Sequence, residues 1–184
     1  NISVREINPL SVSIQMDGRM TYADNGKSVG PNDSTGEVIL YRWRSDTANF
    51  IVNALNTGAA ATGGLFFMQE VANLGKWVYT GDTYYSPSTN VPVNIASRHG
   101  STFVNGAVDG TALTANTTPV ALTDLSAADF DLGYDFMGTI GTFRVWAQDL
   151  TDEGIVDATE PSLEPSLSLT FDSTESSFIV EDWT

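Results

Sequence analysis

The sequence predicts an all-β fold, a sandwich of two antiparallel sheets with one short helix. Apolar and polar residues alternate in many segments, and alternation with a period of two is typical of strands that bury one face. Clusters of Gly, Pro, Asn and Asp separate these segments at regular spacing, as expected of turns. Ser, Thr, Asn and Gly are abundant and lysine is scarce, a composition that favours strands and turns over helices.

The alternation indicates strands along the whole chain. We expect them over residues 10–16, 37–44, 49–55, 64–71, 76–80, 91–97, 101–108, 138–147, 166–171 and 177–181. Within 37–44, strict alternation puts Arg42 on the same face as Val38 and Leu40. The dipeptide Asn105-Gly106 favours positive φ at both positions, so we expect a type I′ hairpin turn there.

A β-bulge is expected in the strand at 138–147. Ile140, Phe143 and Val145 cannot all share one face of a regular strand, because side chains alternate between the two faces. Gly138 and Gly141 stand where a strand either bulges or passes close to another backbone. We expect Phe143, Val145 and Trp146 to pack in the core, as apolar residues of this size usually do.

One short helix is predicted after this strand. Thr151 can cap it, and Asp152 and Glu153 place negative charge in its first turn, which faces the positive end of the helix dipole. Prolines beyond residue 160 end it. We expect the helix to plug one end of the sandwich, and residues 1–184 to form a single domain in which 166–184 supply closing strands.

Charge and composition exclude several classes of function. The 184 residues include 23 acidic and 8 basic side chains, which gives a net charge of −15. Such a chain repels phosphate backbones and anionic lipids, so we expect no nucleic-acid and no membrane partner. The absence of cysteine excludes disulfides, thiolate metal sites and a cysteine nucleophile. The chain begins with Asn rather than Met, so we expect it to be a processed or excised piece.

Several motifs together resemble a known family. They are Ile14 to Tyr22, Ala96 to Gly106 with its Val-Asn-Gly ending, Leu132 to Tyr134, Gly138 to Trp146 and Leu150 to Asp152. This set resembles laminin-G-like or concanavalin A-like jelly-roll domains, of the kind found in phage and prophage structural proteins such as tail fibres and head spikes. The resemblance covers residues 5–158.

The resemblance implies a location and partners. It points to a module at a virion surface or outside the cell, which binds a host surface glycan or serves a structural role. Its other expected partners are further virion proteins or copies of itself. An exported bacterial adhesin module is an alternative that the sequence leaves open. Fold transfers between such relatives more safely than function does.

Catalysis is not expected, although jelly rolls of this type include glycan-active enzymes. Retaining glycosidases need two carboxylates about 5 Å apart, and no Glu-x-Asp-x-Glu strand is present. Asp129-Phe130-Asp131 and Glu181-Asp182 come nearest to that pattern. The single histidine, His99, lacks the nucleophile elbow of a serine hydrolase. A glycan hydrolase or lyase therefore remains the alternative to a binding module.

Aromatic side chains mark the candidate ligand site. Trp77, Tyr79, Tyr84 and Tyr85 fall within nine positions, and alternation puts the first two on one face of their strand. Aromatic faces commonly stack on sugar rings. We expect the loop after this strand and the Arg98-His99 turn to share a rim of the sandwich. The predicted ligand-binding residues are Trp77, Tyr79, Asp82, Tyr84, Tyr85, Arg98 and His99.

No organic cofactor is expected, but a calcium ion could be held at a loop rim. Asp24, Asn32 and Asp33 are the candidate ligands, because calcium prefers carboxylate and carbonyl oxygen. Their spacing matches no ordered calcium loop. Each is also a common turn residue, so ordinary solvated turns are the competing interpretation.

Overall fold

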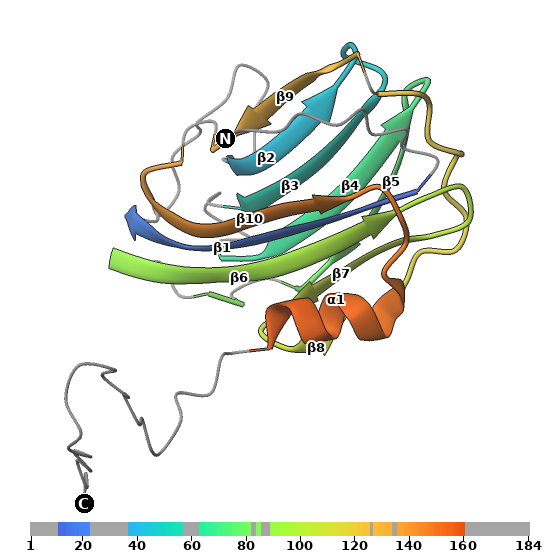
Figure 1. Ribbon diagram of the computed structural model, residues 1–184. Helices are drawn as coiled ribbons and strands as arrows, with labels where there is room; N and C mark the ends of the chain where they lie inside the picture. The colour runs from blue at the N-terminus through green and yellow to red at the C-terminus, as the bar shows by residue number, and fades with distance from the viewer. Residues whose placement is uncertain are drawn as a thin grey trace, which may run out of the picture.

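The computed structural model confirms the sandwich of two antiparallel sheets with one short helix (Figure 1). The structure describes residues 11–22, 37–56, 63–81, 84–85, 89–125, 127–133 and 136–160. Within them, each sheet has five strands. No helix in this part of the chain has the length and apolar character to cross a bilayer.

The chain passes from one sheet to the other several times, so each sheet contains strands from distant parts of the sequence. The first sheet has the order β10-β1-β6-β7-β8 and the second the order β5-β4-β3-β2-β9. The first contains β10 (Gly138–Trp146), β1 (Val12–Tyr22), β6 (Thr89–His99), β7 (Val104–Val108) and β8 (Thr111–Ala112). The second contains β5 (Leu74–Tyr79), β4 (Leu65–Val71), β3 (Phe50–Asn56), β2 (Glu37–Arg44) and β9 (Asp129–Leu132).

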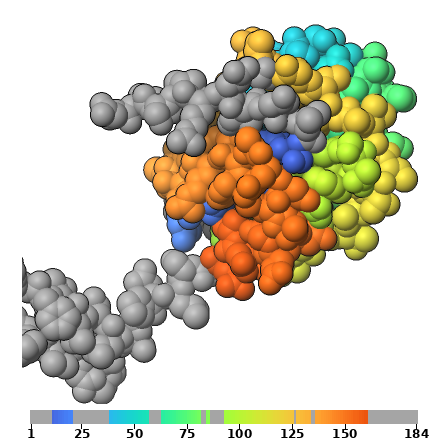
Figure 2. Space-filling view, turned by 45° about the vertical axis from the view of Figure 1, so that its right-hand side comes forward, coloured from blue at the N-terminus to red at the C-terminus, as the bar shows by residue number. Residues whose placement is uncertain are grey.

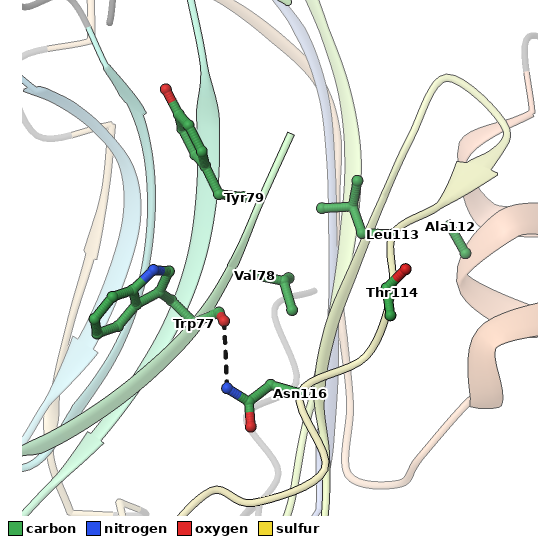
Figure 3. A pocket seen from close by; sticks show the side chains of 7 residues that line it. All are labelled: Trp77, Val78, Tyr79, Ala112, Leu113, Thr114 and Asn116. Atoms are coloured by element: carbon green, nitrogen blue, oxygen red, sulfur yellow. Dashed lines mark hydrogen bonds between the residues drawn. The ribbon is translucent and has the colours of Figure 1, made fainter. Parts of the chain in front are cut away.

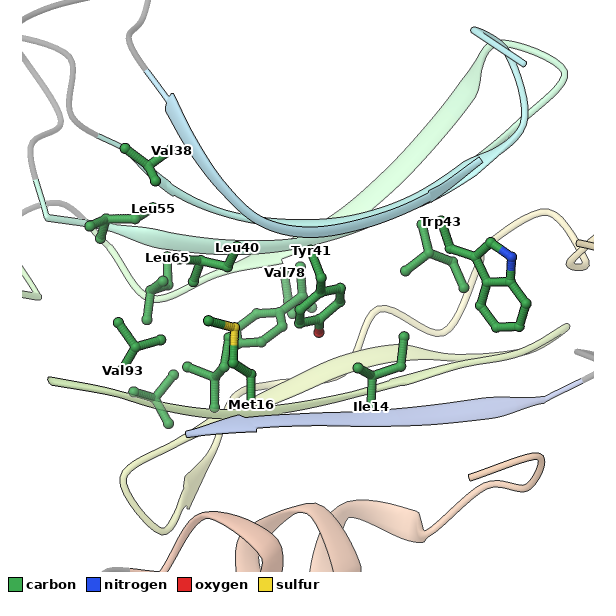
Figure 4. Close-up of a cluster of buried hydrophobic side chains, with 14 of the residues drawn as sticks. Ile14, Met16, Val38, Leu40, Tyr41, Trp43, Leu55, Leu65, Val78 and Val93 are labelled. Atoms are coloured by element: carbon green, nitrogen blue, oxygen red, sulfur yellow. The ribbon is translucent and has the colours of Figure 1, made fainter. Parts of the chain in front are cut away.

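The core fills the space between the two sheets. Alternate residues of each strand point into it, as β4 shows with its regular buried and half-buried pattern. Ile14 and Met16 of β1 face Leu40 and Tyr41 of β2 across this layer (Figure 4). Phe143 and Val145 of β10 are half-buried and pack against the same cluster, as expected. Trp146 is also half-buried but belongs to neither cluster of buried residues, so its predicted place in the core is wrong.

The predicted bulge is present in β10. Asp17 of β1 pairs with Thr142, but the next residue, Gly18, pairs with Ile140. Gly141 is therefore the extra residue, which returns the later side chains of β10 to the core face. Gly18 is required on the partner strand, because a Cβ there would lie 2.4 Å from the Thr139 carbonyl oxygen.

A second bulge corrects the predicted faces of β2. Ile39 pairs with Ala54, whereas Tyr41 pairs with Asn53, so the register shifts at Leu40. Val38, Leu40 and Tyr41 consequently all belong to the core. Arg42 lies on the opposite face, not beside Val38 and Leu40 as strict alternation predicted.

The hairpin turn lies four residues beyond the predicted position. Asn105 and Gly106 are inside β7, and the turn to β8 is made by Asp109 and Gly110, with φ of 49° and 77°. Gly106 has a different role. A Cβ at that position would lie 2.3 Å from the Phe67 ring of the facing sheet. Glycine is needed there for close packing between the sheets rather than for a turn.

The helix α1 (Thr151–Thr159) forms as predicted, with Asp152 and Glu153 in its first turn. Thr151 does not cap it: the helix has no side-chain cap, and the backbone N–H of Thr151 donates to Asp149 Oδ1 at 2.9 Å. The helix lies across the outer face of the first sheet (Figure 1), not over an end of the sandwich.

Small residues let the helix approach the sheet closely. Ala96 of β6 and Ala107 of β7 form a buried cluster with Ile155. The opposite side of α1 faces outward (Figure 2), and Glu153 and Asp157 are exposed there. The strands β8 and β9 were not predicted from the sequence, and the strands expected at 166–171 and 177–181 lie outside the described residues.

Candidate functional site

Five side chains form a line across the outer face of the second sheet, and we call this line the cross-strand row. Trp77 of β5 pairs with Met68 of β4, Met68 with Val52 of β3, Val52 with Arg42 of β2, and Arg42 with Asp131 of β9. Directly paired residues project from the same face of a sheet. The row therefore crosses all five strands of the sheet.

The row lies on the face turned away from the core. Along the strands, its members alternate with Val78, Phe67, Ile51 and Tyr41, all of which belong to the core cluster. The second sheet is bowed so that its concave side is the outer one (Figure 4). A concave face surrounds a ligand on more than one side, which a flat sheet cannot do.

Arg42 and Asp131 make the polar part of the row, and Arg44, two residues further along β2, lies beside them on the same face. Arg42 Nε and Nη2 donate to Asp131 Oδ2 at 3.1 and 2.8 Å. Arg44 Nε lies 3.8 Å from the same oxygen, and the Arg44 side chain is 41% exposed. Fixed guanidinium and carboxylate groups of this kind can donate to and accept from ligand hydroxyls.

The apolar part of the row ends at an exposed indole. Trp77 is 55% exposed, and Tyr79, two residues further on, pairs with Phe66 on the same face. Tyr79 reaches Gly64, where a Cβ would lie 2.1 Å from its hydroxyl oxygen. The prediction that Trp77 and Tyr79 share one face is confirmed, and that face is the outer one.

A shallow open depression of about 550 Å³ adjoins the row at the edge of β5. It is lined by Trp77, Val78, Tyr79, Ala112, Leu113, Thr114 and Asn116. Asn116 Nδ2 donates to the Trp77 carbonyl oxygen at 3.5 Å (Figure 3). In the same view, Val78 points toward Leu113 and the Trp77 ring points away from it. We call this feature the edge depression.

Tyr84 and Tyr85 lie in the loop after β5. Their rings meet edge to face with centroids 5.0 Å apart. Tyr84 is 41% exposed. Tyr85 is half-buried, and its hydroxyl donates to Asp109 Oδ2 at 2.9 Å. Burial, followed by the negative charge of Asp109, raises the pKa of Tyr85. Tyr84 therefore offers a ring to solvent, whereas Tyr85 mainly holds the loop.

Arg98 does not serve as the predicted rim donor. Its Nε and Nη2 donate to the two carboxylate oxygens of Asp149 at 2.7 and 2.8 Å, and Nη1 donates to Asp152 at 2.7 Å. The guanidinium also lies 3.9 Å from the Phe103 ring centroid. With its side chain 12% exposed, Arg98 fastens α1 to the first sheet and is not available to a sugar carboxylate.

The prediction that His99 lies at a rim of the sandwich is also wrong. It is fully buried, and its Nε2 lies 3.0 Å from Ser97 Oγ. Burial lowers the pKa of His99 to about 3. Moreover, the loop at 81–88 precedes β6, whereas Arg98 and His99 end it. A strand of 11 residues separates these two points by roughly 33 Å, so they cannot share a rim.

The remaining predicted residues lie outside the described part of the chain. These are Asp82 of the ligand site and the calcium candidates Asp24, Asn32 and Asp33. The calcium site therefore stays a prediction. Among the described residues, no three His, Asp or Glu side chains come together as a metal site.

Sequence reasoning missed Arg42, Arg44 and Asp131. One available signal was the Arg-Trp-Arg order in 37–44, where two cations flank a tryptophan at alternate positions. Strict alternation would still have put both arginines on the core face. Only the bulge at Leu40 directs them outward, and only the pairing with β9 brings Asp131 beside them.

Neither a known protein family nor a curated protein sequence matches the chain. Solved structures do resemble it. The CBM40 module of the IT-sialidase of Ruminococcus gnavus, solved bound to α2,6 sialyllactose, superposes with a TM-score of 0.58 at 11% identity. That match covers 83% of this chain and 84% of the other.

Two further structures are similar. Domain 4 of AbnA, an extracellular arabinanase of Geobacillus stearothermophilus solved with arabinotriose, matches with a TM-score of 0.52 at 14% identity, over 86% of this chain and 69% of that one. The receptor-binding domain of botulinum neurotoxin type G matches at 0.54 and 10%, over 95% of this chain and 49% of that one. At these identities the likeness shows the fold alone: the chain is a jelly-roll β-sandwich.

Proposed function

We propose that this domain is a non-catalytic carbohydrate-binding module that holds its ligand on the outer face of the second sheet. The observation that carries the proposal is the position of Trp77. Its indole is 55% exposed, and it stands in one cross-strand row with the Arg42–Asp131 pair. An exposed aromatic ring in line with fixed polar groups offers one ligand both an apolar face and hydrogen-bonding partners.

The chemistry of the row suits a sugar. The C–H face of a sugar ring packs on an indole, which offers a large apolar surface. Sugar hydroxyls both donate and accept, and the Arg42–Asp131 pair supplies both kinds of partner. The similar folds solved with sialyllactose and with arabinotriose support a glycan as the class of ligand.

The carboxylates favour binding over turnover. Asp129 and Asp131 both lie on the outer face of β9, where they pair with Arg44 and Arg42. Asp131 Oδ2 already accepts two hydrogen bonds from Arg42. A glycosidase needs one carboxyl group that is protonated and free to donate its proton to the leaving oxygen. We therefore propose that bound polysaccharide is released unchanged.

The resemblance to phage structural domains extends the proposal to location. In that setting the module acts at a virion surface, where a host surface glycan is its ligand and other virion proteins or copies of itself are its neighbours. An exported adhesin module would bind glycan through the same face. In either setting we expect whole cells to bind the isolated domain, and we expect removal of their surface polysaccharide to abolish that binding.

A glycan array with matched variants tests the proposal. The domain is expected to bind a subset of glycans, and Trp77→Ala is expected to abolish that binding while the melting temperature stays unchanged. Leu74→Ala is the control, because Leu74 is 58% exposed on the same strand but lies outside the row. Binding that survives Trp77→Ala contradicts the proposal. New reducing ends or unsaturated products favour the alternative, a glycan-active enzyme.

A further inference from the structure

We infer that the ligand is the interior of a neutral glycan chain that lies along the cross-strand row, and not a single terminal sugar. This inference rests on the proposed function and specifies its ligand. Two observations carry it: the separation of the apolar and polar parts of the row, and the balance of charge on the face.

The row is longer than one sugar ring. Trp77 is on β5 and Arg42 on β2, with β4 and β3 between them. Three strand spacings separate the two side chains by roughly 14 Å. Val52, between them, is 7% exposed and offers little surface to a ligand. A ligand that uses both the stacking ring and the Arg42–Asp131 pair must therefore be an oligosaccharide.

Both ends of the row lie at edge strands. β5 and β9 are the outermost strands of the second sheet. At the β5 end, the row meets the edge depression, where Thr114 and Asn116 add polar groups beyond Trp77. A pocket for one terminal sugar is closed around the ring that it recognises. Here polar groups continue past the backbone of β5 at Trp77, which suits a chain that runs on.

The charge on the face excludes an acidic chain. Arg42 and Arg44 supply two positive charges, and Asp129 and Asp131 pair with them across the strands. Glu70 joins the same face: a Cβ at Gly75 would lie 2.4 Å from the methyl of Met68 and 3.0 Å from Glu70 Oε2. Among the described residues of this face, three carboxylates against two guanidiniums give a net negative charge, in a chain of net charge −15. A uronate or sialate chain would be repelled.

A series of oligosaccharides of increasing length tests the first half of the inference, that the ligand is an extended chain. The isolated domain is titrated calorimetrically with one to six units of the neutral oligosaccharide that binds best among arabinan, xylan, mannan and galactan fragments. We expect the affinity to rise by about tenfold or more until the chain reaches both parts of the row, and then to level off. A monosaccharide that binds as tightly as the hexasaccharide overturns the inference while leaving the proposed function intact.

Variants at the two ends of the row show separately how much its apolar part and its polar part contribute to binding. Trp77→Ala and Asp131→Asn are each expected to weaken hexasaccharide binding by tenfold or more, whereas a disaccharide is expected to respond to only one of them. Arg44→Gln repeats the test at an exposed side chain if Asp131→Asn lowers the melting temperature. Leu74→Ala is the control for both. Equal sensitivity of both ligands to both variants contradicts an extended site.

Acidic polysaccharides test the second half of the inference, that the bound chain is neutral. Polygalacturonate and polysialic acid are expected to bind at least tenfold more weakly than the best neutral polymer at low salt, and added salt is expected to narrow the difference as it screens the repulsion. Tighter binding of either acidic polymer overturns the assignment of a neutral chain. Failure of every neutral and acidic polymer to bind rejects the proposed function itself.

Discussion

The hydroxyl of Tyr41 donates to Ser97 Oγ at 2.7 Å and so joins the two sheets through the centre of the core. Both residues are fully buried. His99 Nε2 lies 3.0 Å from the same Oγ, so three polar groups form one chain inside a mostly apolar layer. Burial raises the pKa of Tyr41, with the Ser97 hydrogen bond opposing it. This arrangement fixes β2 of one sheet against β6 of the other.

Replacing Tyr41 by Phe is expected to lower the free energy of unfolding by about 1–2 kcal/mol, the usual cost of leaving a buried hydrogen-bonding group without its partner. Urea denaturation measures the change. Tyr85→Phe is the control, because its partner Asp109 lies at the surface and water can replace the lost bond. An equal loss in both variants would show that the buried position adds nothing.

His99 is expected to stay neutral in the folded protein at every pH above 4. Its pKa is lowered from 6.5 to about 3 because burial penalises the charged imidazolium. The chain has a single histidine, so its ring resonances in the NMR spectrum report this group alone. They should not shift between pH 8 and pH 5. A titration centred near 6.5 would place the ring in solvent.

The same burial makes stability depend on pH. Between pH 6.5 and 3 the unfolded chain binds a proton at His99 that the folded chain does not, so the free energy of unfolding falls as the pH falls through this window. His99→Gln is expected to flatten that part of the profile, while the contribution of the carboxylates is common to both proteins. Parallel profiles would contradict the assignment.

The fold and the aromatic end of the candidate site could be predicted from local patterns, whereas its polar end could not. Alternation identified β2 and β4 to within a residue of their ends, because each buries one face along its whole length. The bulge at Gly141 followed from the same logic, since three apolar residues had the wrong spacing. The bulge at Leu40 could not be found in this way. Val38, Leu40, Tyr41 and Trp43 are all apolar, so either face of a regular strand would have had apolar residues to bury.

Long-range pairing explains the errors at the site. Nothing near Arg98 in the sequence shows that Asp149 and Asp152 will occupy its guanidinium. His99 looked like a turn residue because Gly100 follows it, yet its place on the inner face of β6 is set by pairing with Val12 and Val104. Asp131 joins Arg42 only through the four-residue strand β9, too short to show an alternation.

Replacing Arg98 by Met is expected to loosen α1 from the first sheet. The variant keeps an apolar stem against Phe103 but removes the donors to Asp149 and Asp152. Charge-assisted bonds of this kind contribute on the order of 1–3 kcal/mol when partly buried. Hydrogen exchange of the amides in α1 should accelerate, with little change in β3 and β4, which belong to the other sheet.

Arg44→Met is the matched control for this prediction. It removes the same charge, but Arg44 Nε approaches its carboxylate only to 3.8 Å, and its side chain lies in the second sheet. Exchange in α1 should stay as in the unaltered protein. If both variants accelerate exchange in the helix equally, net charge rather than the Arg98 contacts holds α1 in place.

The last prediction separates Tyr84 from Tyr85. Tyr84 is 41% exposed, so Tyr84→Ala is expected to leave the melting temperature nearly unchanged. Tyr85 packs against the core cluster, its backbone N–H donates to the Gly63 carbonyl oxygen at 2.9 Å, and its hydroxyl holds Asp109. Tyr85→Ala should therefore destabilise the domain by about 2–4 kcal/mol, as truncation of a packed aromatic does. Because neither ring is a member of the cross-strand row, glycan affinity per folded molecule should change less than twofold in either variant. A tenfold loss in Tyr84→Ala, with the melting temperature kept, would move the ligand from the sheet face to this loop.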